Sequence, residues 1–229
     1  MKSIWQGIIG AFNLILGFDR NIIEIVLLSL YVSFMSTIIS SIIGVFLSLF
    51  ITIEDFKFNK GLKGTINTFM AIPPVVAGLL VYIIFSKSGP FGSLGLLFTP
   101  TVMIIAQIII LVPLIAGTAI NIINTKGSII LEELNNLNAD KKSRYTLLFR
   151  ELKFNIIATV FLGFSRAISE VGAVMLVGGN IEHKTRVMTT YIVLQTNMGN
   201  FEEAIAVGII LLCISFLVNL LISNLNRES

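Results

Sequence analysis

Two charged residues lie four positions apart inside an otherwise apolar stretch of the chain. Arg166 and Glu170 belong to the run Ser165–Ala173, and residues four apart share one face of a helix. Charges at membrane depth are costly, so they pair, face the interior of a helix bundle and mark functional sites. Two roles stay open for this pair: groups that line a transport path, or an ion pair that only fixes packing.

Two adjacent prolines, Pro73 and Pro74, interrupt a second apolar stretch. Because proline has no amide hydrogen and clashes with the preceding turn, we expect the helix to kink or break there. Backbone broken at membrane depth is tolerated where it is buried in protein or faces a watery cavity, as in many transporters. A structural kink and a position on a transport path both fit this pattern.

Other kinds of chemistry lack the residues they need. One histidine, His183, and one cysteine, Cys213, supply neither a set of metal ligands nor an intrachain disulfide. The apolar stretches hold no histidine and two carboxylates, Glu24 near the start of the first and Glu170, too few groups for an intramembrane hydrolase or a proton relay. The chain also has no GxxxxGK[ST] phosphate-binding loop. We therefore expect no catalytic residues, no metal, no cofactor and no ATP hydrolysis by this chain itself.

The composition is that of a membrane protein. Hydrophobic residues make up 55% of the 229 positions and charged residues 13%, against roughly 25% charged in soluble domains, and the mean hydropathy is +0.92. Five stretches reach the roughly 20 apolar residues that a spanning helix needs. We therefore predict an all-α integral membrane protein, one permease-like domain over residues 1–229, with spans at about residues 22–53, 64–85, 96–123, 152–177 and 204–225.

The first span carries a stripe of small residues. Ser29, Ser33, Ser40, Gly44 and Ser48 recur at spacings of four and seven, which places them on one side of a helix. Since helices in lipid associate through small faces that let backbones approach, we predict a packing face. Before this span, residues 3–17 separate apolar from polar positions at helical spacing, which predicts an interfacial helix rather than a cleaved signal peptide.

The basic residues give an orientation. Ten of the sixteen lie in the connections 54–63 and 124–153 or in the tail from Asn226, which five spans place on one side. Five lie on the other side, at Lys2, Arg20, Lys87, Lys184 and Arg186. The positive-inside rule then places the N-terminus outside and the C-terminus in the cytoplasm, so the net charge of +3 reflects topology rather than binding to nucleic acid.

The longest polar connection, residues 124–151, predicts two short helices. The first begins at Ser128, with Glu132 and Glu133 in its early turns, and Asn138 tolerates the left-handed conformation that could end it. The second begins after Asp140. Two short helices on the cytoplasmic face form a docking element for a soluble partner.

These segments together resemble the permease subunits of type I ABC importers. The family's cytoplasmic signature is matched by Glu132, Glu133, Leu134, Leu137, Asn138 and Ala139, although Asn138 stands where the family has glycine and Arg150-Glu151 where many members have Leu-Pro. The runs Pro73–Leu80, Ser88–Gly92 and Phe164–Val174 are similar to the molybdate, tungstate and sulfate branch. The stretch Val177–Ile181 followed by Thr185–Thr190 is most similar to tungstate permeases.

The resemblance implies partners and a mechanism. It implies a homodimer in the prokaryotic inner membrane, surrounded by lipid, with two ATPase subunits on the cytoplasmic face and an external substrate-binding protein. The residues from Glu132 to Ala139 would couple ATP hydrolysis to alternating access. A tungstate permease is the main reading, with a molybdate or sulfate permease, a secondary transporter and a non-transporting scaffold as alternatives. The external connection after Val177 would contact the binding protein or form a solvated loop.

Overall fold

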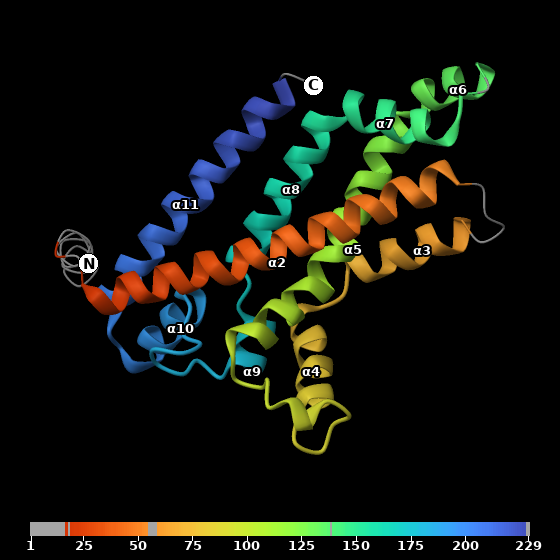
Figure 1. The fold of residues 1–229 in the computed structure, drawn as a ribbon. Coiled ribbons are helices and arrows are strands. Elements are labelled where there is room, and N and C mark those ends of the chain that lie inside the picture. Colours follow the sequence, from red (N-terminus) through yellow and green to blue (C-terminus); the bar gives the residue numbers. More distant parts are fainter. Residues whose placement is uncertain (1–16, 18, 55–58, 138, 228–229) are drawn as a thin grey trace. The chain divides into compact units, whose positions relative to one another are not determined.

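The described part of the chain is helical. The computed structural model describes residues 17, 19–54, 59–137 and 139–227, which form helices with no strand among them (Figure 1). The elements are α2 (Arg20–Ile53), α3 (Asn59–Met70), α4 (Pro74–Phe85), η1 (Gly92–Leu94), α5 (Pro100–Lys126), α6 (Ser128–Asn136), α7 (Lys141–Glu151), α8 (Lys153–Ile168), α9 (Gly172–Gly178), α10 (Met188–Met198) and α11 (Phe201–Arg227). The expected interfacial helix lies outside the described residues, apart from Gly17.

Three of these helices, α2, α5 and α11, are long and apolar enough to cross a membrane. Two helix pairs, α3 with α4 and α8 with α9, pass the same test together, and each is bent at a short break. The all-helical membrane fold is therefore as predicted. The count of five spans stays a prediction, because it requires each bent pair to cross as one unit.

The small residues of α2 are buried, as the sequence predicts. Ser29, Ser33, Ser40 and Ser48 are all at most 4% exposed, and a Cβ added at Gly44 would lie 3.0 Å from Ile115. After its first two residues, the side chains that α2 exposes are large and apolar, among them Leu27, Tyr31, Phe34, Ile42 and Phe46. This division fits a helix with one face on protein and one on lipid.

The chain divides into two compact units. The first comprises Met1–Ser36, Pro73–Gln107 and Ser165–Leu217, and the second comprises Thr37–Ile72, Ile108–Phe164 and Val218–Ser229. In the first unit α4 packs against α9, and a Cβ added at Gly78 would lie 2.6 Å from the Cα of Ala173. Only glycine permits so close a backbone approach, which holds the two short helices together.

The second unit has its own apolar core. Leu49 of α2, Ile123 of α5, Leu148 of α7 and Leu152 and Ile156 near the start of α8 form a buried cluster. Ile130 and Leu131 of α6 and Tyr145 of α7 pack against it. The two short helices α6 and α7, adjacent in Figure 1, are thereby attached to three longer ones.

Two features differ from the expectation. The stretch 152–177 is interrupted at residues 169–171, and residues 188–198, expected in a connection, form helix α10. No proline marks the first interruption. The polar residues Ser169 and Glu170 lie in it, but the four-residue spacing of Arg166 and Glu170 favoured one continuous helix.

Candidate functional site

The proline pair forms a helix start with few unpaired donors. Pro73 has φ −62° and ψ 126°, and Pro74 is the first residue of α4. The N–H groups of Val76 and Ala77 donate to the carbonyl of Pro73 at 2.9 and 3.2 Å. Because two of the first residues are prolines, few amide hydrogens lack a partner at this break. A break here is inexpensive even at membrane depth, which confirms the expected kink or break.

Arg166 and Glu170 do form an ion pair, although they do not share one helix. Helix α8 ends at Ile168, and Glu170 lies in the break before α9. The Nη2 atom of Arg166 lies 3.0 Å from Oε2 of Glu170, and the side chains are 39% and 5% exposed. The carboxylate is thus buried while the guanidinium reaches an open surface.

Glu170 also organises the break itself. Its Oε1 accepts the N–H of Ala173 at 3.2 Å, in the first turn of α9, and its backbone carbonyl accepts the hydroxyl of Thr189 at 2.8 Å. Its own N–H donates to the carbonyl of Ala167 at 3.2 Å. One residue therefore serves the end of α8, the start of α9 and a contact with α10.

Gln107 of α5 is a hydrogen-bond partner for a backbone carbonyl at the end of α8. Its Nε2 donates to the carbonyl of Ala167 at 3.0 Å, and its Oε1 accepts the hydroxyl of Ser36 at 2.6 Å. Gln107 is 3% exposed and Ser36 fully buried. Sequence reasoning missed this residue, although an amide within an apolar span was a signal, since buried polar groups need partners.

The structure brings the two breaks together. A Cβ added at Gly172, the first residue of α9, would lie 2.6 Å from Cγ2 of Val75, the second residue of α4. The proline pair and the ion pair therefore belong to one region of the first unit. The residues predicted to couple to an ATPase, from Glu132 to Ala139, belong to the second unit.

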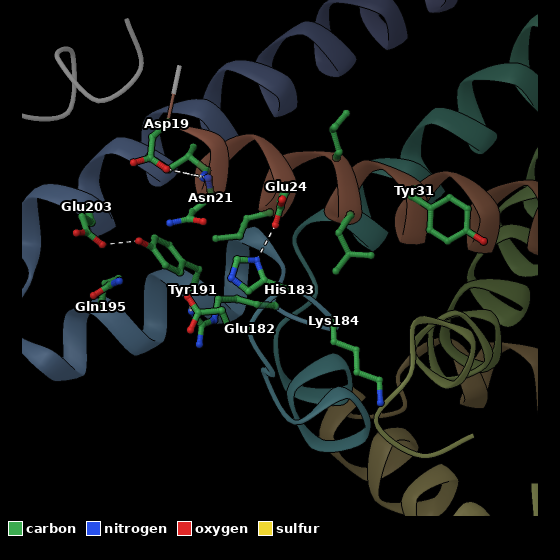
Figure 2. Close-up of a pocket in the computed structure, with 15 residues that line it drawn as sticks. Asp19, Asn21, Glu24, Tyr31, Glu182, His183, Lys184, Tyr191, Gln195 and Glu203 are labelled. Carbon is green, nitrogen blue, oxygen red and sulfur yellow. Dashed lines mark hydrogen bonds and ion pairs between the residues drawn. The ribbon is translucent and has the colours of Figure 1, made fainter. Parts of the chain in front are cut away.

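A cavity of about 740 Å³ lies in the first unit, lined by α2, the segment 182–186, α10 and Glu203 of α11 (Figure 2). Its polar side chains are largely paired with one another. Nδ1 of His183 lies 2.7 Å from Oε2 of Glu24, and Arg186 lies 3.2 Å from Glu182. His183, expected to be an ordinary surface residue, thus ties the segment after α9 to α2.

A tyrosine ties α10 to α11 on the same cavity. The hydroxyl of Tyr191 donates to the carboxylate of Glu203. Burial first, and then this hydrogen bond, raise the pKa of Tyr191 to about 12. The tyrosine therefore keeps its proton at physiological pH and remains a donor.

The predicted coupling element is a helical pair with an exposed apolar surface. Glu132 and Glu133 are exposed, Leu134 is buried, and Ile129 and Leu137 are 65% and 77% exposed. After Leu137 the N–H of Ala139 donates to the carbonyl of Leu134 at 2.9 Å, which closes α6. Asn138 lies outside the described residues.

Helix α7 then starts after Asp140, as expected. The side-chain hydrogen bond from Ser143 is the main cause that lowers the pKa of Asp140 below its ordinary value. A charged carboxylate at this position favours the helix N-terminus. Among the described residues, no group of three His, Cys, Asp or Glu side chains could hold a metal ion.

Comparison with known proteins gives a consistent result. A family model described as "Binding-protein-dependent transport system inner membrane component" matches residues 40–228. A tungstate uptake system permease protein of Peptoclostridium acidaminophilum is 40% identical over 228 residues, which cover 100% of each chain. One from Campylobacter jejuni is 31% identical over 99% of this chain and 95% of the relative. A sulfate transport system permease protein of Escherichia coli is 25% identical over 86% of this chain and 73% of the relative.

The bonds around Ala167 predict how the break responds to mutation. Replacing Gln107 by Leu removes one hydrogen bond from the Ala167 carbonyl and one from the Ser36 hydroxyl, each of which keeps a second partner, at a cost of about 1 kcal/mol per bond. We expect a lower thermal unfolding midpoint in detergent. The control Ser36→Ala removes a hydroxyl without affecting the carbonyl, so its midpoint should fall less. Equal midpoints for Gln107→Leu and the unmodified protein would show that Gln107 does not stabilise the break.

Proposed function

The chain belongs to the family of binding-protein-dependent transport system inner membrane components, and on that premise we propose that it is the permease subunit of an ATP-driven tungstate importer. The observation that carries this proposal is the 40% identity, over the whole of both chains, to a permease protein of a tungstate uptake system. Sulfate permeases are more distant, at 25–26% identity over a smaller share of each chain. Molybdate and sulfate are the alternative cargoes.

A partner must supply the energy. The sequence has no GxxxxGK[ST] loop, so the chain lacks the usual device for holding ATP phosphates. We place a dimer of ATPase subunits on the face that carries α6 and α7. On this orientation that face is cytoplasmic, the C-terminus is inside and the N-terminus outside, in accordance with the basic connections.

The exposed surface of α6 supports docking. Leu137 and Ile129 are large apolar side chains in a polar connection, and Glu132 and Glu133 lie between them. An apolar anchor with a charged rim suits a groove on a soluble partner. Leu134 points into the protein instead, so its role would be to hold α6 in place.

The region of the two breaks supports a transport path. Arg166 exposes 39% of its side chain, and a guanidinium is not stable facing lipid, so it would face water or a second copy of the chain. We propose that two copies enclose the path and that Arg166 lies beside it, with Glu170 moderating its attraction for the anion. Pro73 and Pro74 would allow α4 to tilt as the path opens and closes. Moderate binding suits transport because the ion must leave again.

Cargo selectivity is the first test of the proposal. The permease, its ATPase and its external binding protein are reconstituted in liposomes, and ATP hydrolysis and ion uptake are measured with tungstate, molybdate and sulfate. We expect tungstate to stimulate both and sulfate to stimulate neither, since the external binding protein selects the ion. Equal stimulation by sulfate would contradict tungstate as cargo, and the absence of ATP-driven uptake of all three ions would contradict the importer itself.

Docking is tested by the combined change Glu132→Ala, Glu133→Ala and Leu137→Ala. All three side chains are exposed, so the permease should fold normally, while copurification of the ATPase falls roughly tenfold because a hot-spot anchor is lost. Leu94→Ala, at a leucine that is 58% exposed in η1, is the matched control and should not affect copurification. Undiminished ATPase binding by the triple variant would rule out this docking surface.

The role of the ion pair is tested by neutralising both partners. Arg166→Met with Glu170→Gln removes both charges, and the glutamine oxygen can still accept the Ala173 N–H. Because no charge is left unpaired, we expect normal folding and assembly but roughly tenfold slower uptake. Full ATP-driven uptake by this variant would exclude direct participation and leave the pair a packing role.

A further inference from the structure

A carboxylate at the end of α2 contacts the coupling element. Glu54 follows the last residue of α2, and its Oε2 lies 2.6 Å from Nζ of Lys141, the first residue of α7. Asn59 donates from Nδ2 to the backbone carbonyl of Glu54 at 2.6 Å. The Glu54 side chain is 20% exposed, so it is held at an edge of the second unit rather than free in solvent.

Tyr145 shares this carboxylate. Burial is the main cause that raises the pKa of Tyr145, followed by the negative charge of Glu54, while Lys141 lowers it and a side-chain hydrogen bond with Glu54 raises it. The tyrosine ring packs against the apolar core of the second unit. Glu54 therefore faces two groups of α7, one cationic and one hydroxyl.

The contacts of α7 follow one face of the helix. Lys141, Tyr145 and Leu148 are spaced by four and three residues, which places them on one side. Leu148 is fully buried against Leu49 of α2 and Ile123 of α5. Helix α7 is thus attached at two points, by a polar contact at its first turn and by an apolar contact two turns later.

The two attachments differ physically. Apolar contact is non-directional, so the core around Leu148 and Tyr145 fixes the orientation of α7 less tightly than a directional bond does. A charge-assisted hydrogen bond has a defined length and direction. The hydrogen bond between Lys141 and Glu54, at the first turn of α7, restricts the rotation of α7 about its own axis.

We propose that Glu54 is a positioning residue which, through Lys141 and Tyr145, clamps α7 to the end of α2 so that the coupling helices and this end of α2 move as one body. The inference rests on the proposed function, because it concerns how a push from the ATPase reaches a spanning helix. Helix α2 belongs to both units, with residues up to Ser36 in the first and residues from Thr37 in the second. It is therefore a direct covalent connection between the coupling region and the first unit.

The clamp is tested by separating ATP hydrolysis from transport. In the reconstituted complex, Glu54→Gln should leave ATPase copurification and basal hydrolysis unchanged and lower tungstate uptake per ATP about fivefold, as for the loss of one partly exposed ion pair. Lys142→Met is the matched control, since Lys142 is the exposed neighbour on α7 and makes no ion pair among the described residues.

Rescue and cross-linking separate positioning from a general loss of stability. The exchanged pair Glu54→Lys with Lys141→Glu should recover most of the uptake, which a merely destabilised protein would not do. With Cys213 replaced by serine, Glu54→Cys and Lys141→Cys joined by a short bis-maleimide should keep transporting, because the two ends stay together throughout the cycle.

The outcomes distinguish the two proposals. If the unmodified complex transports but Glu54→Gln transports equally well per ATP, or if the cross-link stops uptake, the clamp is wrong and the importer stands. If the unmodified complex shows no ATP-driven uptake of any oxyanion, the proposed function itself is wrong. Loss of ATPase copurification in Glu54→Gln would also overturn the clamp, since it would assign Glu54 to docking.

Discussion

The carbonyl of Ala167 illustrates the constraint on which the structure depends: in an apolar chain, each backbone group freed by a broken helix needs a partner within the protein. At the end of α8 that partner is Gln107, together with the N–H of Glu170. At the start of α9 it is the carboxylate of Glu170, and at the start of α4 prolines replace residues that would have carried free donors. Each break thus has partners for freed backbone groups within the protein.

The same need for partners within the protein explains the surroundings of the two charged residues Arg166 and Glu170. Glu170 is 5% exposed, yet it carries an ion pair and accepts a backbone N–H, so its charge is compensated on both oxygens. Arg166 pairs through one end of its guanidinium and remains partly exposed. An arginine held in this way presents positive charge at an open surface while its partner limits how strongly an anion is attracted. That combination suits passage of a dianion better than storage of one.

Sequence reasoning identified the elements whose signals are local. Hydropathy located α2, α5 and α11, the proline pair marked one break, and the polar residues Ser128 and Asp140 marked where α6 and α7 start, although the Ser128 hydroxyl donates to the carbonyl of Thr125 instead of capping α6. The second break was missed because the four-residue spacing of Arg166 and Glu170 favoured one continuous helix, and because Gln107, which binds the end of α8, is distant in sequence. The pairing of His183 with Glu24 was missed for the same reason, since contacts between distant residues leave no periodic pattern. Helix α10 was read as part of a connection because the turn-prone residues before it dominated the interpretation.

The short helices of the two units are attached by different kinds of contact, and this difference affects how the chain could move when a partner pushes on it. In the second unit, the coupling helices are held by apolar burial around Leu148 and by a polar contact at Glu54. In the first unit, α4 and α9 are held by backbone approach of Gly78 to Ala173 and by contact between Val75 and Gly172 at the two helix starts. The proposed coupling helices are thus held by an ion pair and an apolar cluster, whereas the helices that follow the two breaks are held by glycine-dependent backbone packing. Under the proposed mechanism, motion would be absorbed at the breaks, because the helical hydrogen-bond ladder is interrupted there, at Pro73 and Pro74 and at residues 169–171.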